Sequence, residues 1–138
     1  MSEFNQGVID EFRANGGVVG GYFEGRNMIL VHHRGAKSGT EYVTPLVYLP
    51  LDGGDLAIFA SAGGAPENPV WFHNIVANPE LTVEVGTETF GVKARIAEGE
   101  ERNRIWEQQK AEVPGFAEYD AKAAPRQIPV IVLERAAS

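Results

Sequence analysis

The segment ELTVEVGTETFGVKARI, residues 80–96, constrains the fold of this chain more than any other part of its 138 residues. Apolar and polar residues alternate on both sides of Gly86-Thr87, which predicts two strands that each bury one face. A turn this short joins antiparallel neighbours, because a parallel connection needs a dozen or more residues. The chain is therefore expected to contain an antiparallel sheet packed on a core.

Compact apolar runs predict the other strands. NMILVHH at residues 27–33 is typical of a buried strand, and EYVTPLVYL at 41–49 predicts the next one. Pro45 inside this second strand indicates a bulge, an edge or a bend, because proline cannot donate a ladder hydrogen bond. The turn signal LDGGD predicts a hairpin from this strand to DLAIFAS at 55–61, and IPVIVLE at 128–134 is the closing strand.

Helical periodicity occurs in four other segments. Apolar residues at positions 4, 8, 9 and 12 share one face of an N-terminal helix that ends before Gly16-Gly17. PVWFHNIVANP, residues 69–79, predicts a short helix with Pro69 in its first turn. EGEERNRIWEQQKAEV and PGFAEYDAKAA predict two more helices before the last strand.

The predicted order is helix, three strands, short helix, two strands, two helices and strand. This order favours an α+β fold that is mainly β, with antiparallel strands in a barrel or curved sheet. A doubly wound fold would alternate strands and helices and carry G-x-G-x-x-G after its first strand, which this sequence does not. The length fits a single domain over residues 1–138.

Composition excludes several classes of function. Nineteen acidic residues against twelve basic ones give a net charge of −7, whereas nucleic-acid binding needs a broad basic surface. The absence of cysteine excludes thiol catalysis and cysteine-ligated zinc. His32 and His33 point to opposite faces of a strand, so they are not expected to form a metal site with His73.

No signal peptide and no apolar run long enough to span a bilayer occur in the sequence, so a cytoplasmic protein is expected. The amphipathic N-terminal helix is compatible with contact at a membrane surface, although packing on its own domain is the commoner use. Monomer and homodimer both stay open.

The loop GAKSG, residues 35–39, follows Arg34 and at first sight resembles a phosphate-binding loop. A nucleotide-triphosphate loop of the form G-x-x-x-x-G-K-[ST] would need glycine at the positions of Val31 and Ala36, so that interpretation fails. Glycine-flanked turns with basic side chains can still hold a small anion. The alternative is a solvated hairpin tip, which composition alone slightly favours.

The segment ASAGGAPENPVWFHN is a second candidate site. Its small residues at 60–64 allow a flat ligand close to the backbone, Trp71 and Phe72 offer a stacking wall, and Asn74 offers a hydrogen bond. Core packing is favoured for Trp71 taken alone, whereas for the whole segment core packing and ligand binding explain the pattern about equally well. A serine hydrolase is not indicated, because no G-x-S-x-G surrounds Ser61. On pattern alone, Tyr119 is a packing residue of its helix.

Taken together, the segments resemble the deazaflavin-dependent nitroreductase family, the coenzyme F420-dependent reductases of actinobacteria. The resemblance rests on FRANGGVVGGYFEG, GAKSG followed by TPLVYL, ASAGGAPENPVWFHNIVANPELTVEVG, GEERNRIW, PGFAEY and IPVIVLE. It extends over nearly the whole chain, and the order and spacing of these segments make it specific. The family implies a split β-barrel like that of flavin-binding reductases, with the deazaflavin in a groove across it.

The resemblance also implies which residues hold the coenzyme. The GAKSG loop and the strand after it would hold the anionic phosphate and oligoglutamate tail, and the other segments would surround the ring. The implied cofactor contacts are Ala36, Lys37, Ser38, Tyr42, Val43, Thr44, Pro45, Leu46, Val47, Phe59, Ala60, Ser61, Ala62, Val70, Trp71, Phe72, His73, Asn74 and Tyr119. Ser61 and Tyr119 would orient or hydrogen-bond the reacting groups, without acting as strict catalytic residues.

This chain departs from the family pattern at three positions. Relatives often carry a basic residue where this chain has Ala36, an arginine at Tyr42 and a lysine at Ala62. Three anion contacts are thereby lost, and two alternatives stay open: Arg34 or Arg26 compensates in part, or the coenzyme tail lies differently.

The implied function is hydride transfer from reduced F420 to a small acceptor: an activated double bond of a lactone or coumarin, a quinone or a nitroaromatic. Two alternatives stay open. One is an FMN-dependent reductase of the same barrel class, and the other is a non-catalytic F420-binding module.

Overall fold

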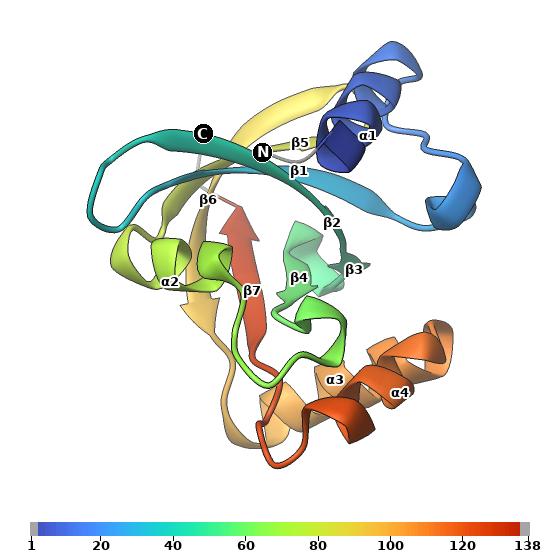
Figure 1. Cartoon of the computed structure of the whole chain (residues 1–138), viewed down its shortest axis with the longest axis vertical. Coiled ribbons are helices and arrows are strands. Elements are labelled where there is room, and N and C mark those ends of the chain that lie inside the picture. Colours follow the sequence, from blue (N-terminus) through green and yellow to red (C-terminus); the bar gives the residue numbers. More distant parts are fainter. Residues whose placement is uncertain (1–2, 136–138) are drawn as a thin grey trace.

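The computed structural model describes residues 3–135, whose strands form one curled antiparallel sheet in the order β2-β1-β5-β6-β7-β4-β3 (Figure 1). The strands are β1 (Met28–Arg34), β2 (Glu41–Val47), β3 (Leu49–Pro50), β4 (Leu56–Phe59), β5 (Glu80–Val85), β6 (Glu88–Ile96) and β7 (Val130–Arg135). The helices are α1 (Glu3–Ala14), α2 (Val70–Ala77), α3 (Gly99–Glu112) and α4 (Gly115–Ala123), with short 3-10 turns η1 (Gly21–Phe23), η2 (Asp52–Gly54) and η3 (Ala62–Gly64). The predicted α+β, mainly β class is confirmed.

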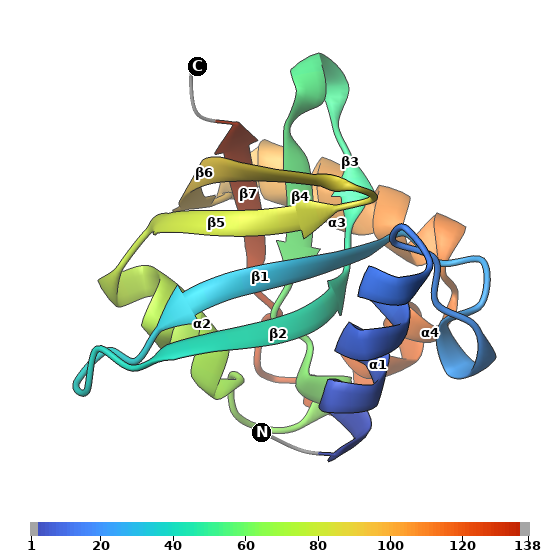
Figure 2. The ribbon, with the colours of Figure 1, turned by 90° about the horizontal axis from the view of Figure 1, so that it is seen from above.

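The hairpin that opened the sequence analysis has the predicted register. β5 and β6 pair from Glu80 opposite Lys93 to Val85 opposite Glu88, around Gly86-Thr87. In Figure 2, β6, β5, β1 and β2 run side by side and cross over β7 and β4. The sheet is therefore strongly curled, as a barrel requires.

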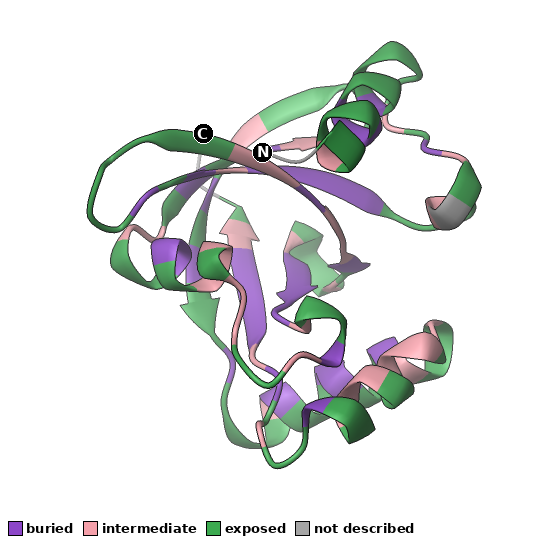
Figure 3. Ribbon diagram, viewed as in Figure 1, coloured by how far each residue is buried: buried purple, intermediate pink, exposed green. Residues whose placement is uncertain are grey.

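The continuous apolar runs belong to strands that are buried on both faces (Figure 3). On β1, Ile29 and Val31 face the core inside the curl, whereas Met28 and Leu30 pack with the apolar face of α1. β7 alternates in the same way between this core and a second core under α3 and α4. Two-sided burial explains why neither run shows the polar alternation of the β5–β6 hairpin.

The second predicted strand differs from expectation. EYVTPLVYL is divided at Tyr48, so that β2 pairs with β1 over its whole length and β3 pairs with β4. β2 and β3 are the two ends of the strand order, yet one residue connects them. The sheet must therefore curl until its two edges meet at Tyr48. Pro45 lies on the edge strand β2, where a missing N–H donor is tolerated.

The N-terminal helix also differs in one detail. Val8, Ile9 and Phe12 are buried as predicted, but Phe4 is 59% exposed. Because α1 begins at Glu3, Phe4 lies in the first turn and contacts Phe23, with the ring centroids 6.0 Å apart, instead of the core. Within residues 3–135, no helix combines the length and the apolar character needed to cross a bilayer.

Candidate functional site

A hollow of about 400 Å³ lies where the end of β2 approaches the turn after β4 and the start of α4. Most of its lining side chains are apolar, aromatic or small, and Arg26 brings a positive charge to it. The residues that line this first hollow are Phe23, Arg26, Pro45, Leu46, Val47, Phe59, Ser61, Ala62, Gly63, Trp71, Val113, Gly115, Phe116 and Tyr119.

A second hollow of about 310 Å³ lies between β1, β2 and α2. Trp71 lines both hollows, which therefore adjoin, and the two together are called the groove below. The second hollow is lined by Asn5, His33, Gly35, Tyr42, Val43, Thr44, Val70, Trp71 and Asn74. It lies beside the GAKSG loop, because Gly35, the first residue of that loop, is part of its lining.

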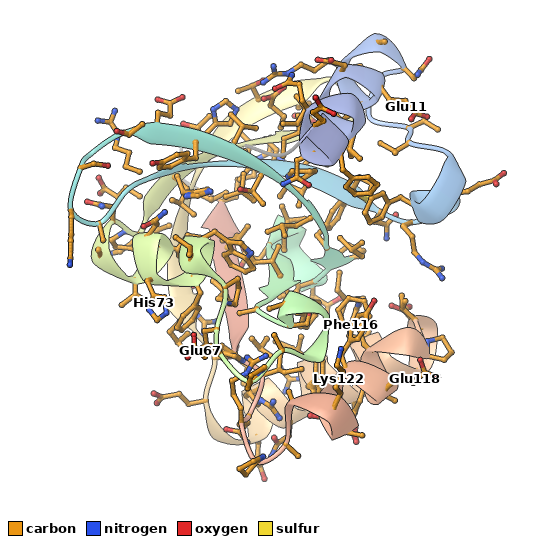
Figure 4. The ribbon with its side chains drawn as sticks, in the orientation of Figure 1. Glu11, Glu67, His73, Phe116, Glu118 and Lys122 are labelled. Carbon is orange, nitrogen blue, oxygen red and sulfur yellow. The ribbon has the colours of Figure 1, made fainter. Side chains whose placement is uncertain are left out.

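Aromatic rings support the first hollow from below. Phe59 lies 5.6 Å from Trp106 and 5.8 Å from Phe116, and Phe116 lies 5.3 Å from Tyr119 between ring centroids. Figure 4 shows Phe116 on α4, which closes this side of the groove. Tilted and edge-on contacts of this kind are favourable and hold large rings in fixed positions. The cluster ties β4, α3 and α4 to one wall of the site.

The loop after β4 is held by Arg126, which follows α4 in the chain. Its guanidinium makes five hydrogen bonds, four to the carbonyl oxygens of Ala60, Ser61 and Ala65 and one to Oδ1 of Asn68. An arginine fork has five N–H donors, so all of them are used. Because Ser61 lines the first hollow, Arg126 fixes the backbone that forms this wall.

The same loop has an unusual backbone. Ala62 has φ of 48°, a left-handed conformation that is unfavourable for a residue with a Cβ atom. Gly64 has φ of 83°, and a Cβ there would come within 2.9 Å of Lys122 Cβ and 3.0 Å of the carbonyl oxygen of Tyr119. Glycine is therefore required where the turn meets α4.

A chain of polar contacts lies behind the second hollow. The backbone N–H of Ala36 donates to Asn74 Oδ1 at 3.0 Å, and Asn74 Nδ2 lies 3.1 Å from His33 Nδ1. His33 Nε2 in turn lies 2.8 Å from Thr44 Oγ1. His33 is 5% exposed and stacks on Tyr42. Burial, and to a lesser extent the neighbouring His32, lowers the pKa of His33 below its usual value.

The opposite face of β1 has different chemistry. His32 contacts Glu84 Oε2 at 2.6 Å and Glu41 Oε1 at 3.3 Å, and Glu84 also accepts two hydrogen bonds from Arg13. The predicted opposite orientation of the two histidines is thus present. Within the described part of the chain, no three histidine or acidic side chains come together as metal ligands.

Most of the predicted site residues line the groove. They are Tyr42, Val43, Thr44, Pro45, Leu46, Val47, Phe59, Ser61, Ala62, Val70, Trp71, Asn74 and Tyr119. On α2 the helical spacing determines which residues line the groove, because positions 70, 71 and 74 share one side of a helix. Phe72 lines a separate hollow, and His73 is exposed (Figure 4).

Four other predicted residues lie beside the groove or behind its wall. Ala60 is fully buried, and its N–H donates to the carbonyl oxygen of Pro129. Ala36, Lys37 and Ser38 are exposed in the loop, where Ser38 Oγ accepts a hydrogen bond from the N–H of Thr40. Coenzyme contacts by these residues stay predictions.

Sequence reasoning missed several residues of the site. Phe23, Val113, Gly115 and Phe116 line the first hollow, and Asn5 and His33 line the second. Their positions depend on how distant segments pack, which local periodicity does not report. One signal was available for Phe116, because it lies three residues before Tyr119 and so shares its helix face.

Comparisons with known proteins match nearly the whole chain. The family model described as F420H(2)-dependent quinone reductase matches residues 6–135. An F420H(2)-dependent quinone reductase of Mycobacterium tuberculosis is 34% identical over 128 residues, which cover 90% of this chain and 85% of the relative.

Solved structures agree with the family model. A structure described as an F420-H2 dependent reductase has 37% identity and a TM-score of 0.71, and the match covers 83% of this chain and all of that one. A second structure, described as a domain-swapped dimer, has 34% identity and a TM-score of 0.73, with 94% and 96% covered. The expected split-barrel fold is confirmed by this likeness.

Proposed function

The chain belongs to the F420H(2)-dependent quinone reductase family, and from this premise we propose that it transfers hydride from reduced coenzyme F420 to small electron-poor acceptors. The observation that carries the proposal is the pair of adjoining hollows, of which the first is lined mostly by aromatic and aliphatic side chains and the second lies beside a basic loop. A coenzyme with a flat ring and an anionic tail matches this arrangement, with the ring in the first hollow and the tail in the second.

The first hollow fits a flat tricyclic ring. Trp71 and Phe59 supply aromatic surface, and residues 45–47 of β2 supply an aliphatic wall. The left-handed turn at Ala62 and Gly63 keeps side-chain bulk away from this space. The size of the hollow, about 400 Å³, is in the range of small-molecule sites.

The second hollow fits the anionic part of the coenzyme. Thr44 supplies a hydroxyl at its wall, and Arg34 and Lys37 flank the exposed loop at its mouth. Arg26 at the first hollow adds a further positive charge. These groups replace some of the cationic contacts that Ala36, Tyr42 and Ala62 do not provide. We infer that Lys37 and Ser38 face the tail, as in the family pattern.

Reduced F420, when bound, supplies a hydride equivalent in a two-electron step. The residues of the chain bind, orient and shield the reactants. Phe116 and Tyr119 close the groove from α4 and exclude water from the first hollow. Among residues 3–135, the backbone N–H groups of Ser61 and Ala62 donate to no other backbone group. We assign these donors, the Ser61 hydroxyl and Tyr119 to the negative charge that develops on the acceptor oxygen.

Quinones are the first acceptors to test, because the family model and the matching relatives are named for them. Activated double bonds of lactones and coumarins, and nitroaromatics, have the same electron-poor character. Purified protein is mixed with reduced F420 and menadione without oxygen, and oxidation of the coenzyme is followed by absorbance. Oxidation well above the protein-free rate is expected, and no oxidation with any acceptor would overturn the proposal.

A binding titration separates this proposal from its alternatives. F420 is expected to bind more tightly than FMN, as measured by fluorescence quenching. Trp71→Ala is expected to weaken F420 binding at least tenfold, since aromatic stacking contributes roughly 1–3 kcal/mol per flat ring. Val76→Ala is the matched control, because Val76 is 56% exposed on the same helix. Tighter binding of FMN would favour the flavin alternative, and F420 binding without turnover would favour a non-catalytic module.

A further inference from the structure

The series of hydrogen bonds behind the second hollow runs from Ala36 through Asn74 and His33 to Thr44, and the chemistry of its groups determines which atom donates at each step. It begins at a backbone N–H group, that of Ala36, which can only donate. The atom of Asn74 at 3.0 Å from this nitrogen must therefore be the amide oxygen. The other end of the Asn74 side chain is consequently its NH2 group, and it is this group that meets His33.

The orientation of Asn74 determines the tautomer of His33. An NH2 group can only donate, so His33 Nδ1, at 3.1 Å, must be the unprotonated nitrogen that accepts. A neutral imidazole with a bare Nδ1 carries its proton on Nε2. Burial of His33, which is 5% exposed, favours the neutral ring. His33 Nε2 therefore donates to Thr44 Oγ1 at 2.8 Å.

The last step concerns the hydroxyl of Thr44. Because its oxygen accepts from His33, its own proton must point away from the imidazole, and Thr44 lines the second hollow. We infer that Thr44 is held as a hydrogen-bond donor toward an anionic oxygen in the second hollow, with Asn74 and His33 as its positioning residues. This inference rests on the proposed function, which supplies the phosphate oxygens of F420 as the acceptor.

The arrangement has a consequence for this chain in particular. The Thr44 donor is uncharged, and neither Ala36 nor Tyr42 has a side chain that carries a positive charge. Tyr42 stacks on the His33 ring at 5.7 Å between centroids and an interplanar angle of 28°, so it shields the imidazole that orients Thr44. Ala36 contributes only its backbone N–H, at the start of the polar chain. The chain thus offers an oriented, uncharged hydroxyl donor at this wall of the second hollow.

Binding of two probes tests the role of Thr44. One is F420, and the other is its deazaflavin core with the ribityl chain but without the phosphate and tail. Thr44→Val keeps the shape and removes the donor, so F420 affinity is expected to fall about tenfold while affinity for the core changes less than twofold. Thr44→Ser is the matched control and is expected to retain F420 affinity. Equal losses for both probes would overturn the inference.

A second measurement tests the positioning residues without any ligand. Nitrogen-15 NMR of the histidine side chains is expected to show His33 with a protonated Nε2 and a bare Nδ1 near neutral pH. His33→Gln can accept from Asn74 and donate to Thr44, so it is expected to retain most of the F420 affinity, whereas His33→Phe is expected to lose it as Thr44→Val does. A His33 protonated on Nδ1 would contradict the inference.

These two measurements also separate the inference from the proposed function. If the unmodified protein bound neither probe, the proposed function would fall and Thr44 would lose its assigned acceptor, whatever the tautomer of His33. If it bound F420 tightly and Thr44→Val bound it equally well, the proposed function would stand and this inference would fall. Melting temperatures of all variants check that each one is folded.

Discussion

The guanidinium of Arg126 donates to the carbonyl oxygen of Ser61 at 2.9 Å, across 65 residues of sequence. This contact connects the segment after α4 to the wall of the first hollow. The position of the proposed anion-stabilising N–H groups therefore depends on a residue that does not line the groove. The first prediction follows from this dependence.

Arg126→Lys is expected to lower kcat/KM for quinone reduction about tenfold and to destabilise the fold by about 2–4 kcal/mol. Lysine cannot reproduce the fork that reaches Ala60, Ser61 and Ala65 together, so partly buried carbonyl oxygens lose their donors. Steady-state kinetics and urea unfolding measure the two effects. Arg104→Lys, at an exposed position of α3, is the control, and an equal effect there would contradict the assignment.

Ala62→Gly is expected to stabilise the fold by about 0.5–1 kcal/mol, because glycine adopts the left-handed conformation without the Cβ penalty. The matched control is Ala77→Gly at the last residue of α2, an exposed right-handed helical position where glycine is expected to destabilise by at most about 1 kcal/mol. Chemical denaturation of both variants checks the pair. Destabilisation of the same size at both positions would show that the backbone of Ala62 is not strained.

Ala36→Arg is expected to raise F420 affinity about threefold to tenfold at low salt, because it restores a charge-assisted contact beside the second hollow. The gain should shrink as salt screens the exposed charge. The backbone N–H that donates to Asn74 is unchanged, so the orientation of Thr44 is preserved. Ala111→Arg, an exposed position on α3, is the control for net charge alone, and the prediction fails if both variants gain equally.

Glu84→Gln is expected to lower stability by about 1 kcal/mol at pH 7 and to have little effect in acid. Hydrogen bonding by Arg13, with a smaller contribution from His32, lowers the pKa of Glu84 below its usual 4.5. A carboxylate with a lowered pKa in the folded state stabilises the fold above pH 4.5, and this stabilisation is lost as the pH falls through the folded-state pKa. Urea unfolding at pH 7 and pH 3 measures the difference, with Glu80→Gln as the control on the same strand.

Strands and helices were predictable because their patterns are local. The β5–β6 hairpin needed only alternation and a two-residue turn, and α2 needed only Pro69 and its periodicity. The division of β2 from β3 was not predictable from pattern, because Tyr48 sits inside an unbroken apolar run. Pro45 indicated an irregularity but not where the pairing changes.

The site was predictable where one segment supplies several of its residues. Residues 42–47, Ser61 and Ala62 were named from the resemblance and line the groove, whereas their contacts with the coenzyme stay predictions. The contributions of His33 and Arg126 were not found, because each depends on partners 11 to 66 residues away in the chain. On α2 a helix was predicted, and its spacing separates Trp71 and Asn74, which line the groove, from Phe72 and His73, which do not.

The meeting of the two sheet edges at Tyr48 has a consequence for how this groove can change. β2 and β4 face each other across the first hollow and are not paired in the sheet. Substitutions on their facing sides alter the shape of the hollow and leave the hydrogen-bond ladders of both strands intact. The shape of the hollow can therefore change through residues of β2 and β4 that face it. The pairing of β2 with β1 and of β4 with β7 does not need to change.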